Sequence, residues 1–343
     1  MRMALLFTLL VLARPGWAQS AEPSQKDVSA TIQVNTQFVL LDALVENKKT
    51  GSTVDTLTAK DFLLSEDGVP QTIAYFSQDQ LPLSVVFLFD MTETVHAALK
   101  PLAQAALEIL GHLKPQDEVA VMIFSSRTEL LQDFTVDRSL AADAIKTASW
   151  MADVEGTFID EDMYEAVNQA LESRLKGSRR VLVWLTDGTA NNENSFTQAA
   201  IGQHSPAHLH TEQEALAKLL RSGVVVSALI DRTAETNAAI MASDMNPSSF
   251  VGGTRVGDIG RYANATGGPV LSTGTKEAAD RLARLLDQIR ARYTLGYKPS
   301  NTKPRPPGTF RKLKLQFSPE FSQEHRDLRK PDLILLTKQG YYR

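Results

Sequence analysis

The sequence contains no cysteine among its 343 residues. This absence excludes disulfide bonds, zinc sites built on thiolates and cysteine nucleophiles. It does not identify a cellular compartment, because a chain of this length can bury a core large enough to be stable without disulfides.

An excess of charge of one sign is also lacking. Lys and Arg number 36 and Asp and Glu number 40, which gives a formal net charge of −4. Proteins that bind nucleic acid usually carry a basic surface, so we expect no nucleic-acid partner. The hydrophobic fraction of 43% and the charged fraction of 22% are typical of globular domains, and the length suits one large domain or two smaller ones.

No apolar run is long enough to span a bilayer, which takes about 20 helical residues. Near the start, Arg2 precedes the apolar run Ala4–Ala13, and small residues follow at Gly16 and Ala18. This order is typical of a secretory signal peptide, so we expect residues 1–18 to be cleaved. The sequence therefore predicts an exported protein that is periplasmic, bound to the cell surface or secreted, with no transmembrane segment after cleavage.

Sequence motifs of common enzyme classes are missing as well. The chain has no G-x-S-x-G, no phosphate-binding P-loop and no G-x-G-x-x-G. Three acids, Asp160, Glu161 and Asp162, stand together at the expected start of a helix, where negative charge favours the helix dipole. Because no pair of nucleophile and base can be identified, we expect no enzyme and assign no catalytic residue.

What the chain does contain is an alternation of strand and helix patterns between residues 82 and 298. Three predicted strands are continuous apolar runs (VVFLF, VLVWL and VVVSALI), as expected for parallel strands covered on both faces. The predicted helices between and after the strands are Val95–Leu113, Arg138–Ser149, Glu161–Lys176, Thr211–Arg221, Gly257–Ala265 and Thr275–Tyr293. This order predicts an α/β fold with a doubly wound, mostly parallel, Rossmann-like sheet.

The flanks of this region predict strands. Residues 28–80 contain a strand near Phe38–Val45 and a hairpin at Glu66–Gly68, where the Asp-Gly pair favours a tight turn. Residues 308–343 contain Phe310–Phe317, in which apolar and polar residues alternate. Each set is too small to close a core alone. We therefore expect the C-terminal strands to pair with the N-terminal segment and to form a β-sandwich beside the α/β sheet.

Oxygen-bearing side chains stand where the strands of the α/β region end. Asp90, Thr92 and Thr94 come directly after the run SVVFLF. Asp187 follows the run VLVWLT, and Thr157 lies in a loop before a predicted helix. Open α/β sheets bind ligands at the carboxyl ends of their strands, and carboxylates and hydroxyls suit a hard cation such as Mg²⁺. The five residues are therefore candidate ligands of one divalent metal ion.

These residues and their surroundings resemble the von Willebrand factor type A domain. The order D-x-T-x-T, then Gly-Thr, then T-D-G is similar to the metal-ion-dependent adhesion site of that family, in which serines stand at the positions of Thr92 and Thr94. The segments LTAKDFLLSEDGVPQTIAYFS, RRVLVWLTDG and IRARYTLGYKPSN extend the resemblance to VWFA-related proteins of Acidobacteria over nearly the whole mature chain. The resemblance implies that Mg²⁺, or Mn²⁺ or Ca²⁺ in its place, binds at Asp90, Thr92, Thr94, Thr157 and Asp187. It also implies a protein ligand that offers an acidic side chain to the metal.

Other interpretations stay open at this stage. The alternative to metal binding is that Asp90 and Thr92 only cap the following helix. A metal-assisted hydrolase on the same rim would need a polarised water near the acids Asp160–Asp162. An envelope structural protein would keep the fold with a metal-free site. The segment His204–His210 holds three histidines, and solvated loop histidines are favoured over a zinc site because no Cys or HExxH pattern accompanies them.

Overall fold

A computed structural model gives the fold of the chain. It describes residues 38–78, 80–92, 95–125, 127–151, 159–187, 210–232, 259–300 and 306–342. The predicted signal peptide, Thr94, Thr157, His204 and His208 lie outside the described residues. Within them, no helix is both long enough and apolar enough to cross a membrane.

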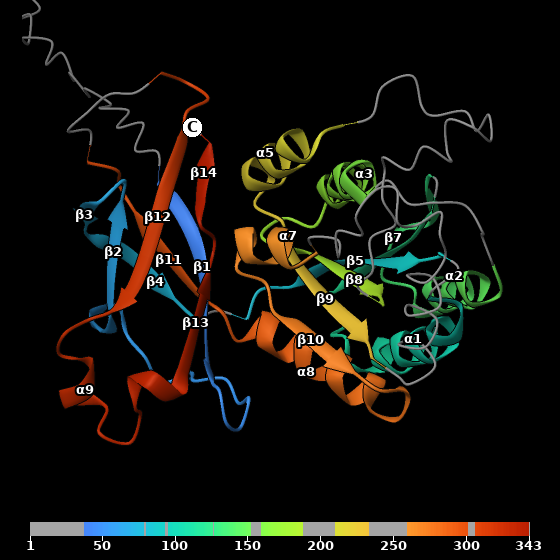
Figure 1. The fold of residues 1–343 in the computed structure, drawn as a ribbon, viewed down its shortest axis with the longest axis horizontal. Coiled ribbons are helices and arrows are strands. Elements are labelled where there is room, and N and C mark those ends of the chain that lie inside the picture. Colours follow the sequence, from blue (N-terminus) through green and yellow to red (C-terminus); the bar gives the residue numbers. More distant parts are fainter. Residues whose placement is uncertain are drawn as a thin grey trace, which may run out of the picture. The chain divides into compact units, whose positions relative to one another are not determined.

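A six-stranded sheet with the strand order β10-β9-β8-β5-β6-β7 runs through the α/β region (Figure 1). Its strands are β5 (Leu83–Asp90), β6 (Glu118–Phe124), β7 (Thr128–Thr135), β8 (Arg179–Thr186), β9 (Val225–Asp231) and β10 (Val270–Thr273). Every neighbouring pair is parallel except β6 and β7, which are antiparallel. Because β5 lies between β6 and β8, the sheet winds outward from β5 in both directions. The predicted doubly wound, mostly parallel sheet is confirmed.

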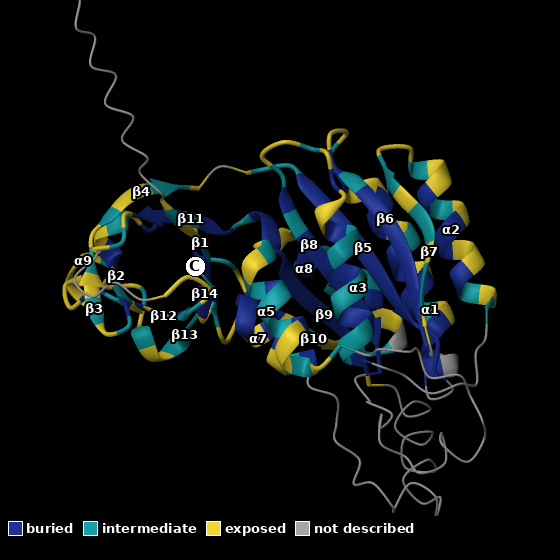
Figure 2. Cartoon of the chain, turned by 90° about the horizontal axis from the view of Figure 1, so that it is seen from above, coloured by how far each residue is buried: buried dark blue, intermediate teal, exposed yellow. Residues whose placement is uncertain are grey.

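Helices cover both faces of this sheet, and its strands are buried between them (Figure 2). The helices on one face are α1 (His96–Ile109), α2 (Arg138–Trp150) and α8 (Ala278–Arg290). Those on the other face are α3 (Ile159–Leu171), α5 (Glu212–Ser222) and α7 (Ile259–Thr266). In β5, Phe87 and Phe89 face the first set while Val86 and Leu88 face the second, so all eight residues of the strand are buried. This two-sided burial explains why β5 reads as a continuous apolar run.

Two four-stranded sheets, in the orders β13-β1-β11-β4 and β14-β12-β2-β3, make the β-sandwich. Their strands are β1 (Val39–Asn47), β2 (Phe62–Glu66), β3 (Val69–Gln71), β4 (Ile73–Ser77), β11 (Tyr293–Tyr297), β12 (Phe310–Phe317), β13 (Leu333–Thr337) and β14 (Gly340–Tyr342). The N-terminal strands β1 and β2 pair antiparallel with the C-terminal strands β13 and β12. Both sheets contribute to one apolar core, which includes Leu41 and Tyr293 from the first sheet and Phe62 and Leu315 from the second. The predicted flanking sandwich is confirmed.

The turn between β2 and β3 follows the sequence signal. Asp67 and Gly68 have φ angles of 51° and 84°, so both central residues are left-handed. A two-residue hairpin turn of type I′ needs this conformation at both positions, which Asp-Gly adopts readily. Just before β2, Asp61 bonds back to the N–H of Thr58 and closes a capping box on the short 3-10 helix η1 (Ala59–Asp61).

Two features of the α/β region differ from the prediction. The helix predicted over Thr275–Tyr293 ends at Arg290, and Tyr293–Tyr297 forms β11 in the sandwich. The Tyr293 hydroxyl bonds the backbone of the 54–57 segment, which ties this part of the chain to the sandwich core. The strand β7 was not predicted, because none of its residues is fully buried and it carries no continuous apolar run.

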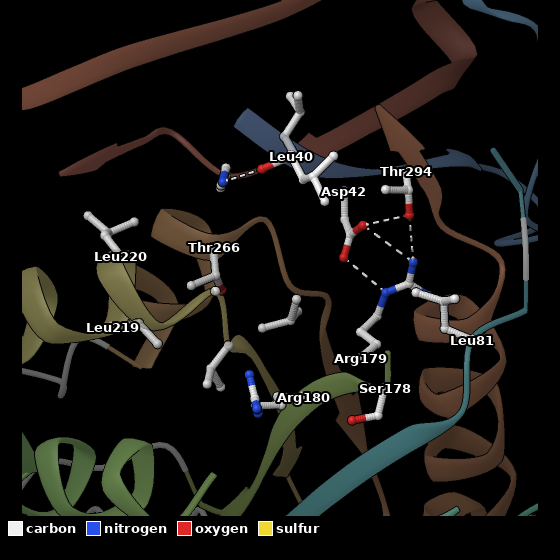
Figure 3. Close-up of a pocket in the computed structure, with 15 residues that line it drawn as sticks. Leu40, Asp42, Leu81, Ser178, Arg179, Arg180, Leu219, Leu220, Thr266 and Thr294 are labelled. Atoms are coloured by element: carbon white, nitrogen blue, oxygen red, sulfur yellow. Dashed lines mark hydrogen bonds and ion pairs between the residues drawn. The ribbon is translucent and has the colours of Figure 1, made fainter. Parts of the chain in front are cut away.

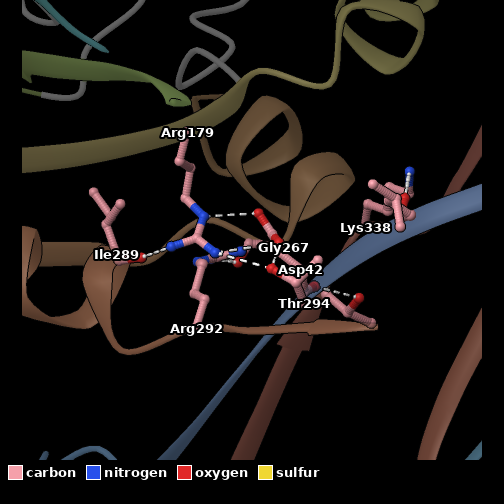
Figure 4. A network of polar contacts seen from close by, with 9 residues as sticks. Asp42, Arg179, Gly267, Ile289, Arg292, Thr294 and Lys338 are labelled. Atoms are coloured by element: carbon pink, nitrogen blue, oxygen red, sulfur yellow. Dashed lines mark hydrogen bonds and ion pairs between the residues drawn. The ribbon is translucent and has the colours of Figure 1, made fainter. Parts of the chain in front are cut away.

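A buried ion pair connects the α/β sheet to the sandwich (Figure 4). Arg179, at the start of β8, donates from Nε to Asp42 of β1 over 2.9 Å and from Nη1 to the carbonyl of Ile289 over 2.8 Å. Arg292 is buried nearby and donates to the carbonyl of Gly267. Burial alone would raise the pKa of the Asp42 carboxyl, but Arg179, Arg292 and the Thr294 hydroxyl together outweigh burial and hold that pKa below its usual value.

Asp42 and Arg179 also line a cavity of about 210 Å³ (Figure 3). Its other walls come from the beginnings of β8 and β9, at residues 178–180 and 223–225. The cavity therefore lies at the amino ends of the parallel strands. The predicted metal ligands that the structure describes, Asp90, Thr92 and Asp187, lie at the opposite, carboxyl-end edge of the sheet.

Candidate functional site

The candidate site lies where β5 and β8 end side by side. The parallel register pairs Phe89 with Leu185, which sets Asp90 beside Thr186 at the carboxyl edge. Asp187 is the next residue along the chain. Asp90, Thr186 and Asp187 are all buried. The structure thus brings the first and last acids of the predicted site to one edge of the sheet.

The Asp90 carboxylate is held by hydrogen bonds to both of its oxygens. Oδ1 accepts from the backbone N–H of Thr92 over 3.0 Å and from the Thr92 hydroxyl over 2.7 Å. Oδ2 accepts from the Thr186 hydroxyl over 2.6 Å. Three donors therefore fix one carboxylate in one orientation.

The charge of Asp187 acts on the buried carboxyl of Asp90. Burial, and then the nearby charge of Asp187, raise the pKa of Asp90 to about 7, against the lowering effect of the hydrogen bonds from Thr186 and Thr92. Ionising both carboxylates in this buried place is unfavourable, and a divalent cation between them would remove that cost. Two carboxylates and a hydroxyl are oxygen donors of the kind that Mg²⁺ prefers. The described residues of the site therefore fit a hard divalent cation.

The helix-capping alternative requires side-chain bonds from Asp90 or Thr92 to the start of a helix. Helix α1 begins at His96, and its N-cap residue is Val95, which has no side-chain capping bond. Asp90 accepts from Thr92 and not from the first turn of α1. Asp90 and Thr92 thus bond each other ahead of the described start of α1, and residues 93 and 94, which separate them from α1, lie outside the described residues.

Three of the five predicted ligands, Asp90, Thr92 and Asp187, meet at this edge, while Thr94 and Thr157 lie outside the described residues. The sequence reasoning missed two supporting residues. Thr186 bonds Asp90 directly, and Arg232 donates from Nη1 to the carbonyl of Asp187 over 2.9 Å. The threonine of the T-D-G segment was a signal for the first, because a hydroxyl at a buried strand end needs a partner. No sequence signal pointed to the second.

The three acids at the start of α3 do not converge on one point. Asp160 accepts a hydrogen bond from the Tyr262 hydroxyl, and Asp162 accepts one from Thr128 over 2.7 Å. Glu161 bonds His210 instead. Each acid thus has a separate partner on a different element.

The expectation of solvated histidines is wrong for His210, the one member of the 204–210 cluster that the structure describes. Its side chain is 22% exposed, and Nδ1 lies 2.7 Å from Oε2 of Glu161. Its ring stacks on Tyr164 with 3.5 Å between the ring centroids. The contacts come from α3, which sequence spacing could not place beside residue 210.

Comparison with known protein families agrees with this fold. Residues 85–189 match the family model of the von Willebrand factor type A domain, and this range contains all of β5 except its first two residues, the Asp90 turn and β8. The matched segment and the observed sheet fit the α/β fold of a von Willebrand factor type A domain. The type A family model ends two residues after Asp187, so it spans the first and last predicted metal ligands. No curated protein matches the sequence.

Several solved structures resemble the type A domain of this chain. The von Willebrand factor type A protein from Catenulispora acidiphila is 10% identical, covers 84% of this chain and 72% of its own, and has a TM-score of 0.43. BatB from Bacteroides thetaiotaomicron is 14% identical over 60% of this chain and 98% of its own, with a TM-score of 0.38. The type A domain of the pili tip protein Mfa5 from Porphyromonas gingivalis is 12% identical over 60% and 95%, also with a TM-score of 0.38.

Proposed function

We propose that this protein is an exported type A binding module that captures a protein ligand through a divalent cation. The cation is Mg²⁺, with Mn²⁺ or Ca²⁺ as alternatives, and its ligands are Asp90, Thr92, Thr94, Thr157 and Asp187. The observation that carries the proposal is the pair of buried acids, Asp90 and Asp187, at the β5–β8 edge.

The residues at the β5–β8 edge would have different roles in binding a cation. Asp90 and Asp187 supply the negative charge, and the Thr92 hydroxyl supplies a neutral oxygen. The Thr186 hydroxyl and the Thr92 N–H hold the Asp90 carboxylate in place, as outer hydrogen bonds do in metal sites. A bound cation would offer an exchangeable coordination position to an acidic side chain of the ligand protein.

The separate partners of Asp160, Glu161 and Asp162 favour binding over hydrolysis. A hydrolase of this rim would need one of these acids free to activate a water beside the metal. Asp160 is bonded to Tyr262, Glu161 to His210 and Asp162 to Thr128. We therefore assign no catalytic residue and propose that the protein is not an enzyme.

Export is part of the same proposal. Residues 1–18 have the order of a secretory signal peptide, which supports export. A ligand protein is therefore sought in the cell envelope or outside it.

A chelator-controlled capture experiment tests the proposal. The immobilised protein is exposed to envelope extract of the source organism in Mg²⁺ or in EDTA, beside Asp90→Asn and the control Asp143→Asn, an exposed acid on α2. We expect a defined protein that the unmodified chain and the control retain in Mg²⁺ only, and that Asp90→Asn does not retain. Equal retention in EDTA would instead indicate a structural protein with a metal-free site.

A further inference from the structure

A second group of metal-ligating side chains lies between α3 and the start of α5. Glu161 and Glu165 come from α3, and His210 precedes the capping residue of α5. One ligand atom of each residue lies within 4.8 Å of those of the other two. None of the three belongs to the type A site proposed above.

The two glutamates share one side of α3 because they are four residues apart. Like charges at this spacing destabilise a helix slightly unless something offsets them. A cation between the two carboxylates would turn this repulsion into an attraction. The position of His210 against Glu161 adds an imidazole nitrogen to the same point, at 2.7 Å from Oε2.

Two contacts hold the imidazole of His210 in a fixed orientation. Its own backbone N–H donates to Oε2 of Glu161 over 2.7 Å. The His210 ring stacks nearly parallel on the ring of Tyr164, at an interplanar angle of 8°. The ammonium group of Lys218 also lies 4.4 Å from the centroid of the Tyr164 ring. The histidine is thus oriented by the same helix that supplies the two carboxylates, which is the preorganisation that a metal site requires.

We propose that Glu161, Glu165 and His210 form a Zn²⁺ site. An imidazole with two carboxylates suits zinc, whereas Mg²⁺ prefers oxygen ligands alone. Zinc bonds of about 2.0–2.2 Å in a tetrahedron place ligand atoms roughly 3.3 Å apart. The 2.7 Å contact between His210 and Glu161 would widen to this spacing, and the ligand atom of Glu165 already lies within 4.8 Å of both. In the bound state, Nδ1 of His210 and the Glu161 carboxylate would each bind the zinc in place of their direct contact, and any proton on Nδ1 would be released to solvent.

Three protein ligands leave the fourth tetrahedral position to water or to an added ligand. A surface pocket of about 900 Å³ adjoins the group, and His210, Tyr164 and Lys218 are among the residues that line it. The zinc would therefore be reachable from solvent. Zinc binding would also link the start of α5 to α3, on the sheet face opposite α1.

Another histidine and acid group offers an internal comparison. Asp61, Glu324 and His325 also lie close together in the sandwich. There, however, Asp61 already bonds the backbone of Thr58 through Oδ2 and His325 through Oδ1. The capping role explains that cluster without a metal, so it serves as a control.

Zinc binding to the purified full chain tests the proposal, by competition with a chromophoric chelator. All variants carry Asp90→Asn, which removes the type A site and keeps the two proposals separable. We expect one zinc ion per chain, a loss of affinity of at least tenfold in His210→Gln and in Glu165→Gln, and no change in His325→Gln or in His112→Gln, an exposed histidine.

Circular dichroism of each variant checks folding. Glu165→Gln is the decisive variant because, among the described residues, the Glu165 side chain accepts a hydrogen bond only from Asn168, three residues along α3. Absence of zinc binding in the parent chain overturns the proposal. So does an unchanged affinity in Glu165→Gln, or a loss confined to His325→Gln.

Discussion

Replacing Asp42 with asparagine is expected to destabilise the protein strongly. The Asp42 carboxylate bonds Arg179 and also acts on the buried Arg292. The substitution keeps the shape of the side chain and removes its charge, so two buried guanidinium groups lose the anion that faces them. Burial already lowers the pKa of Arg292 to about 10 against the effect of Asp42.

The size of the effect follows from the burial of this pair. Breaking a buried ion pair by removing one partner typically costs about 3–5 kcal/mol, whereas an exposed pair contributes about 0–1 kcal/mol. The side chains of Arg179 and Asp42 are 2% and 23% exposed. We therefore expect a loss of about 3 kcal/mol or more of unfolding free energy in Asp42→Asn, and a similar loss in Arg179→Met. The double variant should lose less than the sum of the two.

At acid pH the unfolding free energies of the parent chain and of Asp42→Asn should become more similar. Against burial, Arg179, Arg292 and Thr294 together lower the folded-state pKa of Asp42 below its unfolded value of 3.8, so the carboxylate stabilises the fold above about pH 4. That stability is lost as the pH falls through the folded pKa. Asp42→Asn has no carboxylate at this position and so does not lose this stability in acid. The difference in unfolding free energy between the variant and the parent chain should therefore narrow below pH 4.

Urea unfolding followed by tryptophan fluorescence measures these changes, because Trp184 is fully buried in β8 and reports on the α/β sheet. Asp143→Asn, whose side chain is 73% exposed beside Lys146, is the matched control and should change stability by less than about 0.5 kcal/mol. A loss under about 1 kcal/mol in Asp42→Asn, or additive losses in the double variant, would refute the reasoning.

Three further predictions follow from single contacts. Thr186→Val removes a donor to Asp90 and should weaken Mg²⁺ binding about 10-fold to 100-fold, by calorimetry, with little change in thermal stability. Tyr297→Phe removes a 2.5 Å hydrogen bond to the buried Glu66 and should lower the unfolding free energy by about 1–3 kcal/mol in urea. Gly268→Ala would bring a methyl group within 1.7 Å of a backbone oxygen of β9, so we expect more than about 3 kcal/mol of destabilisation or failure to fold, seen as loss of soluble protein.

The central sheet could be predicted because burial on both faces marks its strands in the sequence. β5, β8 and β9 are continuous apolar runs for this reason. β7 is an edge strand with only partial burial, and β11 begins only three residues after the last residue of α8. Neither has a local pattern that separates it from its surroundings, because tertiary pairing decides both.

The acids of the candidate site could be predicted from their positions after apolar strands. Asp90 and Asp187 meet because parallel neighbours end at the same edge. The partner of Asp90 at Thr186 and the contact between Glu161 and His210 could not be predicted in the same way. The second pair is 49 residues apart, and only the packing of α5 against α3 brings it together.

Calorimetric titration of Mg²⁺ tests the central claim most directly. The parent chain is compared with Asp90→Ala, with Asp143→Asn as a control, and with the pair Thr92→Ala and Thr92→Ser. We predict one bound cation in the parent and the control, none in Asp90→Ala, weakened binding in Thr92→Ala and retained binding in Thr92→Ser, because serine keeps the hydroxyl oxygen. Equal Mg²⁺ binding in the parent chain and in Asp90→Ala, or no binding in either, would contradict a metal site at the β5–β8 edge.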